Sequence, residues 1–307
     1  MVRLYIANTD NDWFDFLSSE SDVSEVNFWQ PGAKSFHAIE PGELFAFRLK
    51  SPRDRIGGFG VLSNSSILPL QIAWESFGRA NGTPSYGELR NAIAKYRVGE
   101  EVGPTTNIGC RILVEPIFFP PHLWMELPPS WSKNIVGGKR YSTEQTDGLQ
   151  LWNRLQDIAQ QWSATTAPGF SEPAVRYGSP TLITPRLGQG AFRIAVTEAY
   201  ERQCAISGGK VLPALDAAHI RPYADGGAHI KSNGILFRKD IHSVFDAGYA
   251  TVDSDYRFVV SRKVKEVFNN GEEYRRLHGK ALKLPNNRVD WPDFELLKWH
   301  NSERFLE

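Results

Sequence analysis

Apolar residues alternate with polar ones near the start of the chain and recur every three or four positions in later segments. Residues 43–50 place Phe45, Phe47 and Leu49 on one face, which predicts a strand with one buried side. The same reasoning predicts strands at residues 3–7, 56–62 and 111–115, and helices at residues 69–79, 85–96 and 148–162. Glycines in the 56–62 segment indicate bulges or tight curvature. The first half is therefore expected to form a small mixed barrel with helices.

A shorter pattern follows in the second half. Residues 214–220 form an apolar run between two prolines, which predicts a strand ending near His219. A turn-rich loop containing Asn233 leads into a second short strand. Ile241, Val244 and Phe245 then have helical spacing, so His242 is expected on a helix. This part is predicted to contain two strands and a helix, which makes the chain α+β.

His219 and His242 would then lie close together although 23 residues separate them. Hydrolysis of a phosphodiester needs a base to activate water and a divalent cation to neutralise developing charge. A rigid strand end suits a base, and an imidazole on the neighbouring helix suits a metal ligand. Asn233 lies in the connecting loop, where its amide can orient the base or fasten the hairpin.

The amino-acid sequence of this region resembles that of the HNH endonucleases, the ββα-metal nucleases, in the variant common in bacterial restriction proteins. The segments that carry the resemblance are residues 186–193, 200–208, 217–220 and 241–248. The resemblance implies that His219 is the general base, Asn233 the middle residue of the motif and His242 a metal ligand. It also implies one divalent cation per site, Mg²⁺, Mn²⁺ or similar.

Two positions depart from the family pattern. Many members carry a metal ligand directly before the base, where this chain has Ala218. Asp216 is the nearest upstream carboxylate and is a candidate ligand, but residues three apart on a strand point to opposite faces, so it requires a bent strand. Cys204 is followed at zinc-knuckle spacing by Ser207, so no structural zinc is expected.

Other polar side chains in this region have more ordinary interpretations. We expect His229 to be a loop residue and Asp246 to make a hydrogen bond at the end of the helix. Guanidinium groups match phosphate oxygens in shape and charge. The predicted phosphate contacts are Arg193, Arg221 and Arg238.

Charge is balanced overall, with 35 Lys and Arg against 35 Asp and Glu, which is unusual for a protein that binds nucleic acid. Residues 186–265, however, hold 12 basic against 8 acidic side chains, so contact with DNA would use local patches. The two cysteines, Cys110 and Cys204, fall in different halves and predict no disulfide framework. The chain has neither a secretory signal pattern nor an apolar run of membrane length, so we expect a cytoplasmic protein that does not contact a membrane.

Residues 26–32, 39–45 and 56–60 resemble EVE and related PUA-like domains, which bind modified bases flipped out of nucleic acid. An extruded base needs a stacking face and a few hydrogen bonds to its edge. The candidate pocket residues are Asn27, Phe28, Trp29, Gln30, His37 and Trp74, with Trp29 the first choice. The predicted organisation is a PUA/EVE-like recognition domain at residues 1–165, a linker at 166–185 and an HNH domain at 186–307.

Together these features predict a modification-dependent restriction endonuclease. Its front domain would bind a modified cytosine, of the 5-methyl or 5-hydroxymethyl type, in duplex DNA, and two copies would act as a homodimer on DNA. Three alternatives remain open at this stage. In the first, the chain is an HNH nuclease or nickase whose front domain binds a DNA sequence, RNA or a protein. In the second, it is a non-catalytic reader of modified DNA. In the third, its front domain serves only a structural or dimerising role.

Overall fold

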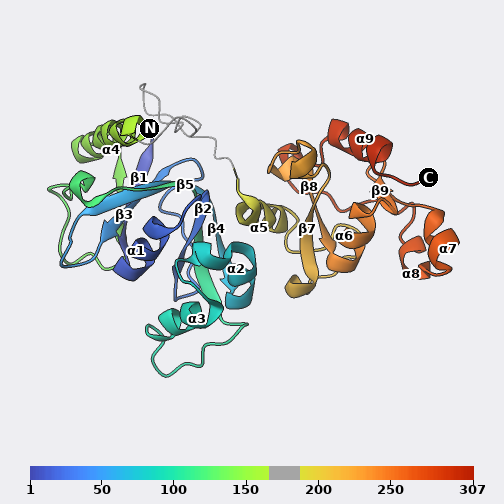
Figure 1. Ribbon diagram of the computed structural model, residues 1–307, viewed down its shortest axis with the longest axis horizontal. Helices are drawn as coiled ribbons and strands as arrows, with labels where there is room; N and C mark the ends of the chain where they lie inside the picture. Colours follow the sequence, from blue (N-terminus) through green and yellow to red (C-terminus); the bar gives the residue numbers. More distant parts are fainter. Residues whose placement is uncertain (166–186) are drawn as a thin grey trace. The chain divides into compact units, whose positions relative to one another are not determined.

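The computed structural model describes residues 1–165 and 187–307, apart from the side chains of residues 159, 160 and 162–165. The described chain divides into two compact units, Met1–Ala191 and Phe192–Glu307 (Figure 1). The predicted linker at residues 166–185 lies outside the described residues. Both units combine strands with helices, which confirms the predicted α+β class.

The first unit is built on a six-stranded sheet in the order β2-β5-β4-β3-β1-β6. Its strands are β1 Arg3–Thr9, β2 Glu25–Gln30, β3 Leu44–Leu49, β4 Ile56–Pro69, β5 Asn107–Phe118 and β6 Gly138–Ser142. The β1–β3 pair is parallel and the remaining pairs are antiparallel. Pairing of β4 with β5 shifts register twice, as the glycines of β4 led us to expect. At Gly58 a Cβ atom would lie 2.1 Å from the carbonyl oxygen of Ile117, so the close approach of the two strands requires glycine.

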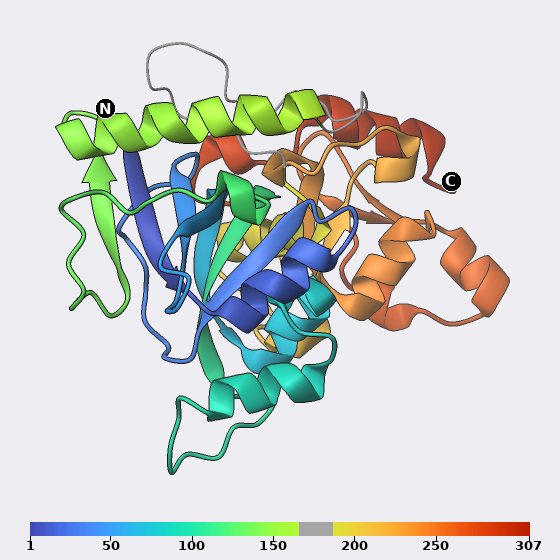
Figure 2. The ribbon, with the colours of Figure 1, turned by 60° about the vertical axis from the view of Figure 1, so that its left-hand side comes forward.

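Four helices accompany this sheet: α1 Asn11–Ser19, α2 Leu70–Phe77, α3 Tyr86–Ala94 and α4 Thr146–Thr165. Short 3₁₀ turns lie at η1 Gly78–Asn81 and η2 Pro121–Leu123. Helix α1 was not expected from the sequence; Asp10 caps it, and it buries Trp13, Phe14 and Leu17. α4 contacts β1 and β6 and runs across the edge of the sheet that these two strands form (Figure 2).

Both faces of the central strand β3 are covered. Phe45, Phe47 and Leu49 pack in an aromatic core with the side chains of α1, as the alternation predicts. Leu44 and Ala46 on the other face are also buried, so β3 is not the half-exposed strand that the sequence suggested. A strand buried on both faces loses the clean alternation that identifies an exposed side.

The second unit is organised around a hairpin and one helix. β7 Leu215–His219 pairs antiparallel with β8 Gly234–Arg238, and α6 Lys239–Asp246 follows directly (Figure 1). Ile241 and Phe245 of α6 are buried, and the ring of Phe245 packs against Phe237 of β8. The two strands and the helix therefore occur in the order predicted from the sequence.

The rest of the second unit surrounds this ββα element. Its other elements are the C-terminal part of α5 Gln189–Ala199, η3 Leu212–Ala214, η4 Tyr223–Asp225, η5 Lys231–Asn233, β9 Ala250–Val252, β10 Phe258–Val260, α7 Lys263–Phe268, α8 Glu272–Arg275, η6 Arg288–Asp290 and α9 Phe294–Glu303. Among the helices of the described residues, none is long and apolar enough to cross a membrane.

Candidate active site

His219 is the last residue of β7, and its ring is held on two sides. One face stacks on Phe192 of α5, with ring centroids 3.8 Å apart and an interplanar angle of 14°. Its Nε2 atom lies 3.0 Å from Nδ1 of His229. Gly234 pairs with His219 across the hairpin, and a Cβ atom there would lie 2.4 Å from a methyl group of Val196 and 2.9 Å from Phe192. Glycine at position 234 thus leaves room for the side chain on which His219 stacks.

This environment favours the neutral form of His219. Burial lowers the pKa of the imidazole to about 4, and the neighbouring His229 acts in the same direction. A neutral imidazole has a free lone pair at neutral pH, which is what a general base needs.

We expect the His219 ring to titrate far below the ordinary histidine range. As pH falls, the neutral form should persist through pH 6.5 and become protonated only near pH 4, because the folded protein holds the ring in a partly buried place. Imidazole nitrogen chemical shifts of the metal-free protein, assigned by comparison with His219→Gln, measure this directly. A midpoint at or above 6.5 would contradict the assignment of a desolvated base.

Asn233 is fully buried and uses its amide on the backbone of the preceding loop. Its Oδ1 accepts a hydrogen bond from the amide of Arg221 at 2.9 Å. Its Nδ2 donates to the carbonyl oxygens of Arg221 and Ala228, each at 2.9 Å. The side chain therefore fixes the loop that begins directly after β7 and carries His229.

His242 lies on α6 between two carboxylates. Its Nδ1 is 3.2 Å from Oδ2 of Asp216 on β7, and its Nε2 is 3.0 Å from Oδ2 of Asp246 one turn along α6. Asp216 was expected beside the metal ligand only if the strand bends; in the structure its side chain faces α6 and reaches His242 directly. Arg193 approaches the other oxygen of Asp216, at 3.4 Å.

The electrostatics of this cluster favour a cation. Burial opposes a charge on His242, but hydrogen bonds to Asp216 and Asp246 outweigh it and raise the pKa of the imidazole to about 9. Burial likewise opposes charge on Asp216, yet His242 and Arg193 hold the pKa of that carboxyl below its ordinary value. Carboxylate oxygen and imidazole nitrogen are also donors that divalent metals accept. The pair Asp216 and His242 thus fits a divalent cation in place of the proton. Within the described residues no group of three or more such side chains is arranged to hold a metal, so a cation there would need further ligands from water or substrate.

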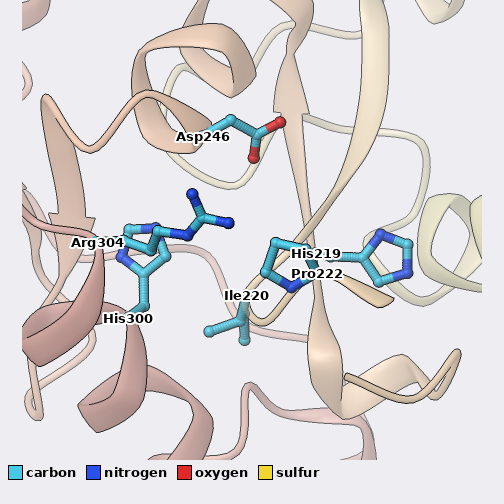
Figure 3. A pocket seen from close by; sticks show the side chains of 6 residues that line it. All are labelled: His219, Ile220, Pro222, Asp246, His300 and Arg304. Carbon is cyan, nitrogen blue, oxygen red and sulfur yellow. The ribbon is translucent and has the colours of Figure 1, made fainter. Parts of the chain in front are cut away.

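A pocket of about 250 Å³ opens beside these groups. Its lining residues are His219, Ile220, Pro222, Asp246, His300 and Arg304. Figure 3 shows the Asp246 carboxylate and the Arg304 guanidinium facing the same space, with His219 on the other side of Pro222. The proposed base and one carboxylate of the His242 cluster therefore border one cavity.

The three arginines predicted to contact phosphate have partners in the protein. Arg193 lies beside Asp216, and Arg238 forms an ion pair with Asp240. The Nε of Arg221 donates to the carbonyl oxygen of Asp225 at 2.6 Å, and its guanidinium lies over the ring of Trp299. Their roles as DNA contacts remain predictions.

The six side chains predicted for a base pocket lie on two faces of β2 and beyond it. Asn27 is fully buried, and its Nδ2 donates to Oδ1 of Asn81. Nε1 of Trp29 donates to the backbone carbonyl oxygen of the same Asn81. Phe28 joins the aromatic core, and Gln30 accepts a hydrogen bond from Arg111. His37 is exposed in the loop that follows β2, and Trp74 packs against Tyr86. Asn27 and Trp29 share one face of β2, and Phe28 and Gln30 share the other, so the strand divides these four side chains into two pairs.

Three residues near the site were not assigned a role there by the sequence analysis. His229, expected to be an ordinary loop residue, contacts His219, and its ring stacks on Tyr223 at 4.9 Å. Asp246, expected to make a helix-end hydrogen bond, contacts His242; its spacing of four residues on one helix was the signal available. Arg304 comes from the distant end of the chain, and no local pattern links it to the pocket.

Comparison with known protein families finds one match within the second unit. Residues 204–253 match a family described as HNH endonuclease. The matched segment contains His219, Asn233 and His242, and it confirms the resemblance on which the sequence analysis relied. No curated protein matches the chain.

Several solved structures are similar to the chain at low identity, among them the following two. The ASCH protein of Zymomonas mobilis is 11% identical, with a TM-score of 0.35, over 48% of this chain and 94% of its own. The modification-dependent TagI restriction endonuclease is 14% identical, with a TM-score of 0.29, over 92% of this chain and 76% of its own.

Proposed function

We propose that this chain is a metal-dependent DNA endonuclease whose cleavage site lies in the second unit. The observation that carries the proposal is that a neutral His219 and Asp246 border one pocket, and that Asp246 contacts His242, which in turn contacts Asp216. All four residues lie inside a segment that matches the HNH endonucleases. A base and a cation-binding group side by side are the two components that hydrolysis of a phosphodiester requires.

In the proposed reaction His219 accepts a proton from a water molecule, and the hydroxide attacks phosphorus in line with the leaving 3′ oxygen. When bound, a divalent cation of the Mg²⁺ or Mn²⁺ class supplies positive charge to the phosphate and the leaving oxygen. Asp216 and His242 would hold it, and Asp246 would fix the imidazole of His242 through the other ring nitrogen. Asn233 holds the loop behind His219 and so keeps the base in place.

The first unit is proposed to select the substrate by binding a flipped, modified cytosine of the 5-methyl or 5-hydroxymethyl type. Support comes from the resemblance of residues 26–60 to EVE and PUA-like domains and from Trp29, a half-buried aromatic ring at the end of an edge strand of the sheet. Such a ring offers a stacking face to an extruded base. Because one HNH site cuts one strand, a double-strand break would require two copies, and we propose a homodimer assembled on DNA.

The nuclease part of the proposal is tested by incubating DNA with the purified full chain, with EDTA, Mg²⁺ or Mn²⁺. We expect cleavage only with metal, and products with 5′ phosphate and 3′ hydroxyl ends, because attack on phosphorus expels the 3′ oxygen. Metal-independent cleavage would contradict the proposed site. DNA binding without any cleavage, in either metal, would favour the non-catalytic reader.

Trp29→Ala is expected to reduce discrimination between modified and unmodified cytosine by about tenfold or more, since base stacking contributes roughly 1–3 kcal/mol. The measurement is the ratio of kcat/KM on the two DNAs, for protein whose thermal unfolding matches wild type. Trp131→Ala, a half-buried tryptophan of the same unit outside β2, is the matched control. Unchanged discrimination in folded Trp29→Ala would favour a structural or dimerising front unit.

A further inference from the structure

The last helix of the chain is fastened to the helix that carries His242 and Asp246. His300 of α9 is buried, its ring stacks on Phe245 with centroids 3.9 Å apart, and its Nδ1 lies 2.8 Å from Oγ1 of Thr251. The amide of Leu306 donates to the carbonyl oxygen of Gly248 at 2.9 Å, in the turn that follows α6. The C-terminal segment is therefore packed in a defined position beside the active site, although it lies outside the segment matched by the HNH family.

Arg304, the residue that ends α9, directs its guanidinium into the same pocket as His219 and Asp246 (Figure 3). One nitrogen, Nη2, donates to Oδ2 of Asp225 at 2.6 Å, and the group lies over the ring of Trp299. In the described part of the chain no hydrogen bond involves its Nε or Nη1 atoms. Its side chain is 41% exposed and lines the pocket, so the guanidinium is open to solvent or to a ligand there.

We propose that Arg304 binds a non-bridging oxygen of the phosphodiester in this pocket, so that α9 completes the cleavage site. This inference rests on the nuclease function proposed above and names a residue of that site. A guanidinium has more donors than one carboxylate uses, and its planar fork matches phosphate geometry. Asp225 and Trp299 hold one side of the group and leave the other directed at the substrate. A positive group fixed in advance stabilises the extra charge that phosphorus carries in the transition state.

A purely structural role is the competing explanation, because the Arg304–Asp225 ion pair also joins α9 to the loop after β7. The two roles predict different results for the two partners. Asp225→Asn removes the ion pair but keeps the guanidinium in the pocket, whereas Arg304→Gln removes both. If Arg304 only fastens the loop, the two variants should lose the same activity and the same thermal stability.

The test compares Arg304→Gln, Arg304→Lys, Asp225→Asn and His219→Ala in the full chain, by single-turnover cleavage of DNA and thermal unfolding. Arg276→Gln is the matched control, an exposed arginine of the same unit. We expect Arg304→Gln to cut about 10²-fold more slowly, a typical effect of removing one transition-state donor. Arg304→Lys should recover part of that loss, Asp225→Asn should lose less than about fivefold, and Arg276→Gln should match wild type.

The outcomes separate this inference from the function on which it rests. Cleavage by Arg304→Gln within about threefold of wild type, or an equal loss in Asp225→Asn, would overturn the role of Arg304 while His219→Ala still cuts about 10³-fold more slowly than wild type. If His219→Ala cuts DNA as fast as wild type, the proposed cleavage site is overturned. The inference about Arg304 is then overturned with it. Arg304→Gln and Asp225→Asn both lose the ion pair, so a loss of thermal stability that they share measures the ion pair alone. The difference between the cleavage rates of these two variants then reports the contact of Arg304 with phosphate.

Discussion

His219→Ala is expected to slow DNA cleavage by about 10³-fold, within the range that a positioned general base contributes. The imidazole borders the pocket, is neutral at physiological pH and is held rigid by stacking on Phe192. Alanine leaves Asp216 and His242 in contact, so the affinity for Mn²⁺ should stay within a few-fold of wild type. Single-turnover cleavage and calorimetric metal titration measure the two effects separately.

His122→Ala, an exposed histidine in the first unit, is the control for this experiment and should cut at the wild-type rate. Circular dichroism establishes that both variants are folded. Cleavage by folded His219→Ala within tenfold of wild type would show that another group activates water.

His242→Ala is expected to weaken binding of Mn²⁺ by more than about 100-fold and to abolish cleavage at millimolar metal. Loss of a group that merely orients a metal ligand already costs roughly 10–100-fold in affinity, and loss of the ligand itself should exceed that. Without the imidazole, Asp216 loses the donor that lies 3.2 Å from its carboxylate. Calorimetric titration of Mn²⁺ and the metal dependence of cleavage measure the result.

Asp216→Asn should also weaken the binding of Mn²⁺ and slow cleavage, as His242→Ala does, since the amide oxygen carries no charge. The matched control is Asp255→Asn, an exposed carboxylate of the same unit away from α6. Unchanged metal affinity in folded His242→Ala would mean that the cation binds elsewhere, and the proposed site would have to be abandoned.

Local patterns were sufficient for the centre of the second unit. The apolar run before His219 predicted a strand where β7 lies, and the spacing of Ile241 and Phe245 predicted a helix where α6 lies. β7 is a short apolar run bounded by turns, and α6 is amphipathic with Ile241 and Phe245 on its buried side, so the local patterns identify both elements. The family resemblance in this region and the α+β class were confirmed by the HNH match and by the fold.

Contacts between distant segments were not predictable in the same way. The approach of Asp216 to His242 depends on how α6 docks on the hairpin, which alternation along one strand does not specify. Arg304 reaches the pocket from about 60 residues beyond α6, through the packing of His300 on Phe245. In the first unit, the parallel pairing of β1 with β3 and the return of β6 to β1 likewise join segments far apart in sequence.

The proposed base pocket shows a related difficulty. Neighbouring residues of a strand point to opposite faces, so the run of polar and aromatic residues at 27–30 cannot line one cavity together. Trp29 and Asn27 meet at Asn81, whereas Gln30 meets Arg111 on the other face. The sequence identified polar and aromatic residues suited to a base pocket, but only the fold shows which face of β2 each of them lies on.

The measurement that tests the account most directly is cleavage of matched DNAs containing unmodified, 5-methyl, 5-hydroxymethyl or glucosylated cytosine, with Mg²⁺ or Mn²⁺. We expect wild-type protein to cut DNA with one kind of modified cytosine and to leave the unmodified DNA intact, and His219→Ala to cut the modified DNA about 10³-fold more slowly. Equal cutting of all four DNAs would contradict selection by the first unit, and absence of cutting in every case would contradict the nuclease itself.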